Sequence, residues 1–156
     1  MPTLVFASEM PCPVEALWAF HSSPEALTRL MPPGQRVTVT GDARVETGAI
    51  HDLRIVRWGL PLRWRARIES VEPPTRDRPG RFVDVAVRSP FAAWRHEHRM
   101  EATPDGSRLT DTVTYTPPFG PLGILADRLF LRRDLERLFA HRHEATRAAV
   151  AMGRST

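Results

Sequence analysis

The sequence predicts an α+β fold in which a curved antiparallel sheet of about seven strands wraps around a long C-terminal helix, with two short helices after the first strand. Strand-like segments separated by turn signals fill the middle of the chain, two helix-start signals precede them, and a proline-free stretch follows. The 156 residues are 42% hydrophobic and 26% charged, which is typical of a folded protein. We expect a single domain over residues 1–153.

The first elements are a strand and two short helices. Residues 3–9 alternate weakly between apolar and polar, as a strand does. Pro13 suits the start of a helix, and apolar residues form one face of the segment that follows, so a helix is expected over about 14–20. Ser23 is a good capping residue before a proline, which predicts a second helix over about 24–31.

The middle of the chain predicts a meander of antiparallel strands, because only short turns separate its strand-like segments. In the strand that begins at Leu62, apolar and charged residues alternate, so one face of the sheet is wet and the other is covered. The covered row there is Leu62, Trp64, Ala66 and Ile68. The expected strands are about 35–40, 49–57, 62–71, 82–88, 92–102 and 108–115.

A long helix is expected over about 124–152, ending near Gly153. Its apolar stripe needs a large partner, and the covered face of the sheet is the only one available. A strongly curved sheet cannot touch a straight helix everywhere, so a cavity is expected between them. The predicted stripe consists of Leu125, Leu129, Leu131, Leu135, Leu138 and Phe139.

The strand at 94–101 has two chemically opposite faces. One row is Arg, Glu, Arg, Glu and belongs in water, so the other row must face inward: Trp94, His96, His98 and Met100. A buried imidazole without a partner is costly, so two histidines here favour a lined cavity over a packed core. The alternative is that at least one of them is a hydrogen-bonded structural group.

The register of the last hairpin decides which groups accompany the histidines. Patterning puts Asp111 and Tyr115 on the inner face. With a two-residue turn Asp111 lies opposite Met100, with a four-residue turn it lies opposite His98, and a three-residue turn with a glycine bulge reverses the parity. Asp84 of the preceding strand can also approach His96, although neighbouring valines compete for that face.

These groups give candidate acid–base pairs, because histidine titrates near neutrality and a carboxylate can orient it. The candidate catalytic residues are His96, His98, Asp84 and Asp111. His96 and His98 could also offer two metal ligands, but a stable zinc site wants a third and none lies nearby along the chain. We therefore expect no metal and no cofactor.

Composition excludes several classes of function. All 22 basic residues are arginine, so lysine Schiff-base chemistry and a P-loop lysine are impossible. The net charge is +4, but the arginines are interleaved with acids, so no nucleic-acid partner is expected. No apolar run approaches the roughly 20 residues of a membrane span and no signal peptide is evident, so we expect a cytoplasmic protein.

Taken together, these segments resemble the SRPBCC superfamily (START/Bet v1-like, helix-grip fold), and within it a bacterial group of ligand-binding proteins. The resemblance implies a deep hydrophobic cavity between sheet and C-terminal helix that receives lipids, polyketides, quinones or other apolar molecules. Some relatives are cyclases or hydrolases and others are carriers. The segments that carry the resemblance are 20–33, 82–84, 89–91, 94–98, 109–111, 118–123 and 135–143.

We expect a non-enzymatic binding protein for a small hydrophobic or amphipathic molecule. The alternative is a cyclase or dehydratase that uses His96 or His98 as general base, oriented by Asp84 or Asp111. The residue pattern leaves the oligomeric state open. The expected ligand-binding residues are Trp64, Trp94, His96, His98, Met100, Asp111, Tyr115 and Phe139.

Overall fold

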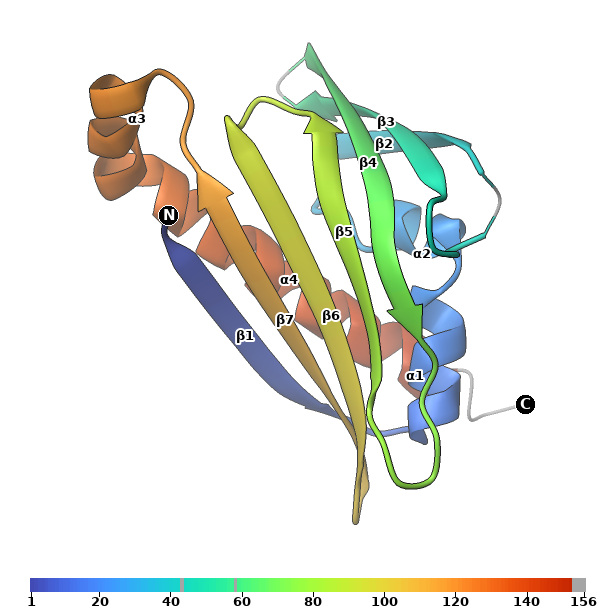
Figure 1. Ribbon diagram of the computed structural model, residues 1–156. Helices are drawn as coiled ribbons and strands as arrows, with labels where there is room; N and C mark the ends of the chain where they lie inside the picture. Colours follow the sequence, from blue (N-terminus) through green and yellow to red (C-terminus); the bar gives the residue numbers. More distant parts are fainter. Residues whose placement is uncertain (43, 58, 153–156) are drawn as a thin grey trace.

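The computed structural model describes residues 1–42, 44–57 and 59–152, so the expected domain end at residue 153 lies outside the described residues (Figure 1). The strands are β1 (Thr3–Met10), β2 (Gln35–Gly41), β3 (Ile50–Arg57), β4 (Leu60–Glu72), β5 (Gly80–Arg88), β6 (Ala93–Thr103) and β7 (Gly106–Thr116). The helices are α1 (Val14–His21), α2 (Pro24–Arg29), α3 (Gly120–Ala126) and α4 (Arg132–Met152), with a π-helical turn, η1 (Asp127–Leu131), between the last two.

The seven strands form one antiparallel sheet in the order β1-β7-β6-β5-β4-β3-β2 (Figure 1). From β2 to β7 each strand pairs with the next along the chain, which the short turns allow. Helices α1 and α2 carry the chain from the β1 edge to the β2 edge. The predicted fold class, with a seven-stranded sheet and a long C-terminal helix, is confirmed.

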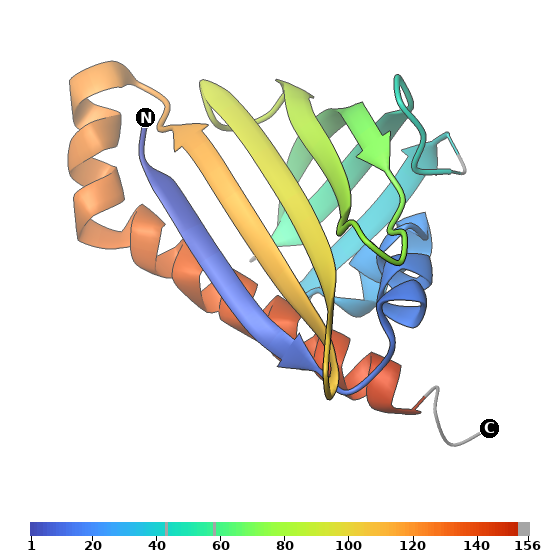
Figure 2. The same cartoon turned by 60° about the horizontal axis from the view of Figure 1, so that its bottom comes forward.

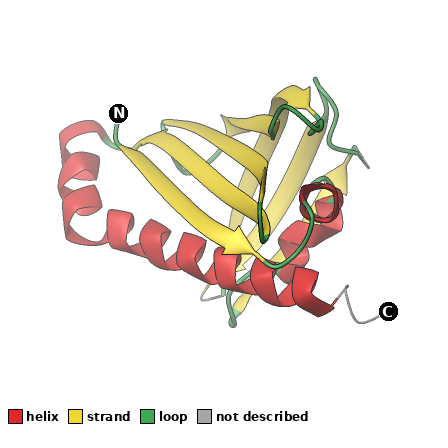
Figure 3. Ribbon diagram, turned by 90° about the horizontal axis from the view of Figure 1, so that it is seen from below, coloured by secondary structure: helices red, strands yellow, loops and turns green. Residues whose placement is uncertain are grey.

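The sheet bends over α4 because its strands are bulged as well as twisted. The pairing of β4 with β5 shifts between Arg65 and Ala66 and again between Ile68 and Ser70. Extra residues of this kind bend a strand and increase its local twist. Figure 3 shows the sheet curving over the long helix, which runs beneath it from the side of α3 toward α1. None of the described helices is long and apolar enough to cross a membrane.

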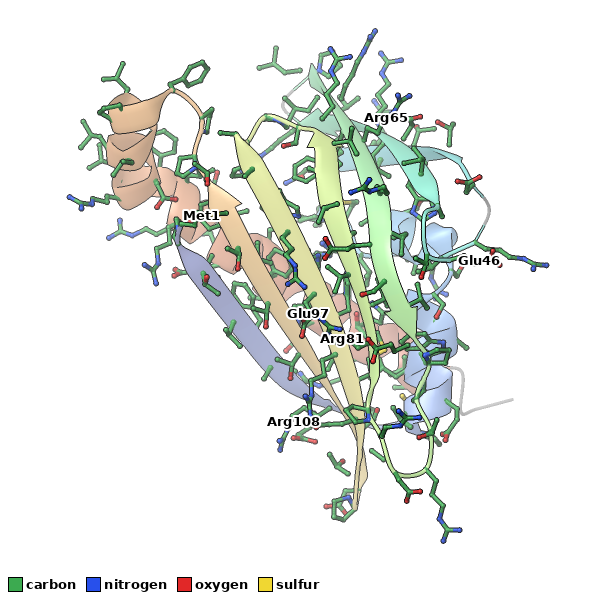
Figure 4. All side chains as sticks on the ribbon, viewed as in Figure 1. Met1, Glu46, Arg65, Arg81, Glu97 and Arg108 are labelled. Carbon is green, nitrogen blue, oxygen red and sulfur yellow. The ribbon has the colours of Figure 1, made fainter. Side chains whose placement is uncertain are left out.

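The two faces of the sheet differ as the alternation predicts. On β6 the inward row is buried, with His96 exposed by 3% and His98 by 5%. The outward row makes surface ion pairs, including one in which Arg81 Nη2 lies 3.1 Å from Glu97 Oε2. Figure 4 shows Arg81 and Glu97 together on the face of the sheet that points away from α4. The charged row therefore marks the wet face.

The C-terminal helix differs from its prediction in where it starts and in its path. It begins at Gly120, and the π-helical turn η1 interrupts it. A π-turn adds a residue to one turn, so the side chains before it and after it no longer share one face. Leu125 and Leu129 are accordingly exposed by 55% and 61%, and their assignment to the buried stripe was wrong, whereas Leu135 and Phe139 are buried. Figure 2 shows α3 turning relative to α4.

A buried contact holds this bend in place. The Tyr115 hydroxyl at the end of β7 donates to Asp127 Oδ1 of η1 at 2.6 Å. Burial and this hydrogen bond both raise the pKa of Tyr115, so its proton stays on the donor oxygen. The bond links the sheet to Asp127, the first residue of η1. Helices commonly kink at a π-turn of this kind.

Phe139 packs at the centre of the contact between α4 and the sheet. Its ring is fully buried and stacks on that of Phe6 from β1 with centroids 4.8 Å apart. The same cluster contains Leu4, Val113 and Tyr115. A buried aromatic ring stabilises the fold in two ways: its apolar surface is removed from water, and it attracts the neighbouring ring.

We expect Phe139→Ala to lower the free energy of unfolding by about 3–5 kcal/mol, because it removes a fully buried aromatic ring from this contact. Leu129→Ala serves as the control, because this side chain is 61% exposed, and it should change the free energy of unfolding by about 0.5 kcal/mol or less. Urea unfolding of the two variants measures both values. Equal losses would contradict the packing described here.

Candidate functional site

A cavity of about 700 Å³ separates the sheet from α4 and the short helices. Its size is within the range that holds drug-sized ligands. Strands β2 to β6 form one wall, and α2, α3 and α4 form the other. Most of the lining is aliphatic or aromatic, including Leu27, Leu30, Leu53, Ile55, Ile68, Phe91, Leu135 and Leu138. Such a wall favours an apolar guest.

Five of the eight expected ligand-binding residues lie on the cavity wall. They are Trp64, Trp94, His96, His98 and Phe139. Trp64 and Trp94 pack edge to face, with ring centroids 5.1 Å apart, so they form a rigid aromatic corner. The candidate catalytic residue Asp84 also lines the cavity.

The other three expected residues lie behind the wall. Met100 packs in a buried cluster with Val14 and Leu17, because α1 covers that end of β6. Tyr115 is bonded to Asp127, as described above. Asp111 lies beneath the histidines and is exposed by only 2%. These side chains support the wall rather than form it.

The hairpin register joins Asp111 to the histidines. Asp111 lies opposite His98, which is the register expected for a four-residue turn. The pairing nevertheless continues to Thr103 and Gly106, so only Pro104 and Asp105 connect the strands. The turn therefore has two residues, but it lies one residue earlier than expected. This shift places Asp111 opposite His98, the register that a four-residue turn would also give.

Asp111 is the centre of a buried network. His96 Nε2 donates to its Oδ1 at 3.1 Å, and His143 Nε2 of α4 donates to its Oδ2 at 3.0 Å. His98 Nδ1 lies 2.9 Å from Oδ1 but without the directional geometry of a hydrogen bond. His143 Nδ1 is also 2.9 Å from the Ser8 hydroxyl of β1. One carboxylate therefore ties together β6, β7 and α4.

Asp84 approaches the same two rings from the cavity side. Asp84 lies directly opposite His96 in the pairing of β5 with β6. The sequence allowed this approach without requiring it. Asp84 Oδ2 lies 3.5 Å from His96 Nδ1 and 3.4 Å from His98 Nε2. These separations exceed the usual length of a charge-assisted hydrogen bond, about 2.7–2.9 Å. Each ring therefore has a carboxylate near both nitrogens.

The electrostatics of the cluster separate the two histidines. Burial alone would raise the pKa of Asp111, but His98, His96 and the hydrogen-bonded His143 hold it well below its usual range. Burial lowers the pKa of His96, and the neighbouring His98 lowers it further. Burial also opposes charge on His98, yet Asp111 and Asp84 together raise its pKa. Of the two histidines, His98 is therefore the one that more readily carries a proton and a positive charge.

Three groups of the cluster were missed in the sequence. Arg142 and His21 line the cavity, and His143 bonds to Asp111. Burial, aided by His98, lowers the pKa of His21 to about 3, and its Nε2 lies 3.3 Å from the Thr146 hydroxyl. His143 was set aside because it cannot chelate together with His141. The spacing of buried Phe139, His143, Thr146 and Val150 is helical and could have flagged it.

The α3 side of the cavity carries exposed apolar side chains. Phe119, exposed by 84%, lies beside Leu122 and Phe130 among the lining residues. Phe119 also has a φ of 63°, which is strained for a bulky residue. Such strain is commonly retained near binding sites, and the apolar lining here continues to the surface.

The fold and the cavity define a helix-grip protein, in which a bent sheet and a C-terminal helix enclose an apolar space. Residues 10–144 match the family model described as polyketide cyclase / dehydrase and lipid transport. The chain belongs to this family, and therefore to the SRPBCC superfamily. A search of curated proteins gives no match.

Solved structures show the same fold at low sequence identity. A protein from Rhodobacter sphaeroides has a TM-score of 0.75 at 17% identity, over 96% of this chain and 92% of its own. The di-domain ARO/CYC protein StfQ of the steffimycin biosynthetic pathway has a TM-score of 0.75 at 14% identity, over 99% of this chain and 52% of its own. Ara h 8.0201 has a TM-score of 0.66 at 14% identity, over 97% of this chain and 98% of its own.

We expect Asp111→Ala to lower the free energy of unfolding by about 3–5 kcal/mol, because it leaves buried histidines without their shared carboxylate. Glu136→Ala, which removes a carboxylate from an exposed pair with Arg132, should leave stability nearly unchanged. Chemical unfolding followed by circular dichroism compares the two. An Asp111→Ala protein as stable as the control would show that the network does not hold the fold.

Proposed function

We propose that this protein binds a small hydrophobic or amphipathic molecule, such as a lipid, polyketide or quinone, and carries or sequesters it. The observation that supports this most directly is the cavity of about 700 Å³ with a mainly apolar lining. Each Å² of apolar surface removed from water contributes about 25 cal/mol, so a guest that fills the space gains affinity without specific contacts.

Polar groups at separate places on the wall favour a guest with a polar end. Asp84, His96, His98 and Arg142 gather at one place. Arg57 and Asp134, which also line the cavity, form an ion pair at 2.9 Å that joins β3 to α4. A few such groups in an apolar cavity fix the orientation of a ligand more than they add to its affinity.

A cyclase or dehydratase is the second candidate. The observation that favours it is the position of His96, His98 and Asp84, which lie close together on the cavity wall, with both histidines buried and Asp84 partly buried. A histidine oriented by a carboxylate is a suitable general base. With a candidate polyketide, His98→Gln would abolish turnover and spare affinity in an enzyme, whereas in a carrier it would weaken binding modestly.

A cavity-filling substitution tests the binding proposal. The neutral fluorescent probe N-phenyl-1-naphthylamine should bind the wild-type protein, and Leu53→Trp should weaken its binding about tenfold or more, because the larger ring occupies the cavity.

The matched control is Arg54→Trp, the next residue of β3, which is exposed. It adds the same indole on the other face of the strand and should bind the probe like the wild type. Circular dichroism confirms that both variants are folded. Equal probe binding by the two variants, or none by the wild type, would contradict the proposal.

A further inference from the structure

We propose that Asp84, His96 and His98 form a binding site for a divalent transition-metal ion at the cavity wall. Each residue offers one ligand atom, and these three atoms lie within 4.8 Å of one another. The inference goes beyond the proposed function, because an apolar guest needs no metal. Along the chain only His96 and His98 are close together, so no metal was expected, and the third ligand, Asp84, comes from the neighbouring strand β5.

The spacing of the ligand atoms fits an ion between them. Two ligands that each lie about 2.1 Å from a tetrahedral ion are about 3.4 Å apart. Asp84 Oδ2 is 3.4 Å from His98 Nε2 and 3.5 Å from His96 Nδ1. The same distances are long for direct hydrogen bonds. The separations between Asp84 Oδ2 and the two ring nitrogens therefore match those expected for ligands that share one ion.

Asp111 supplies the support that histidine ligands usually have. A metal-bound histidine commonly donates its other N–H to a carboxylate, which fixes the ring and its tautomer. His96 Nε2 donates to Asp111 Oδ1, and His98 Nδ1 lies 2.9 Å from the same oxygen. With its proton on this side, His96 directs the lone pair of Nδ1 toward Asp84. An ion bound here would displace the proton of His98 Nε2, which then directs its lone pair to the same point. A cation there would stabilise three converging electron pairs.

The position of the cluster leaves room for a fourth ligand. All three residues line the cavity, and the Asp84 side chain is 17% exposed whereas those of the histidines are 4% and 6% exposed. Three protein ligands with an open position are typical of zinc sites that bind water or substrate. Arg142 also lines this part of the cavity, and its positive charge competes with an ion for the carboxylates.

Two nitrogens and one carboxylate oxygen suit zinc, cobalt or ferrous iron rather than calcium or magnesium. An ion held here would present its open position to a guest in the cavity. It would therefore favour guests that carry an oxygen donor, such as a carbonyl or a phenolate, and could polarise that oxygen as a Lewis acid.

Cobalt binding tests this site without any assay of turnover. The full chain, stripped of metal with a chelator, is titrated with Co²⁺ and then with Zn²⁺. We expect one equivalent of Co²⁺ to give the visible absorption of a site with nitrogen ligands, Zn²⁺ to displace it, and Zn²⁺ to raise the thermal midpoint of the wild type.

Asp84→Asn and His98→Gln should each weaken Co²⁺ binding about 100-fold or more, and Asp111→Asn about 10- to 100-fold, as loss of supporting carboxylates does. Glu97→Gln is the matched control, because it removes a carboxylate from the outer face of β6, and His141→Gln controls for a histidine outside the cavity wall. Both controls should bind like the wild type.

Absence of stoichiometric Co²⁺ binding by the wild type would overturn the metal site, as would equal binding by the ligand variants and the controls. The naphthylamine probe is measured on the same samples. Probe binding without metal binding overturns the metal site alone, whereas metal binding without probe binding overturns the proposed function alone. Circular dichroism verifies folding, and the thermal shift of the wild type gives a reading that needs no variant.

Discussion

A bent sheet and a long helix cannot stay in contact along their whole length, and this constraint shapes the molecule. They meet where Phe139 stacks on Phe6 and where His143 reaches Asp111. They separate over β2 to β6, where the cavity opens. Bulges in the pairing of β4 with β5 supply part of the bend, and the Tyr115–Asp127 bond links the sheet to the turn of the helix at the other end. The empty space is therefore a consequence of how the layers are joined.

The polar cluster stands at the boundary between contact and cavity. A buried carboxylate such as Asp111 is costly unless neighbouring donors compensate it, and three histidines surround it. The hydrogen bond to His96 and the close approach of His98 leave the other nitrogen of each ring toward Asp84 and the cavity. The same network thus contributes to stability and sets the chemistry that a guest meets. A carrier, an acid–base catalyst and a metal site would all use this arrangement, and they differ in what occupies the space beside Asp84.

The alternation of side chains made much of this predictable. The period of two placed His96 and His98 on the inner face, because charged neighbours could only face water. Contacts between the helix and the sheet were harder to predict, because the local sequence does not show which turn of α4 lies against Asp111. His143 was missed for that reason. The π-turn was missed as well, because the contact between its Asp127 and a tyrosine on a distant strand leaves no local signal in the sequence. The hairpin register depended on which two residues make the turn, and patterning allowed both inward registers.

The central physical claim is that apolar space remains between the sheet and α4. A crystal of the protein pressurised with xenon tests it most directly, because xenon occupies dry apolar cavities. The account predicts xenon atoms between the Trp64–Trp94 corner and Phe139. Xenon found only beside the exposed side chains of α3, with side chains filling the interior, would contradict it.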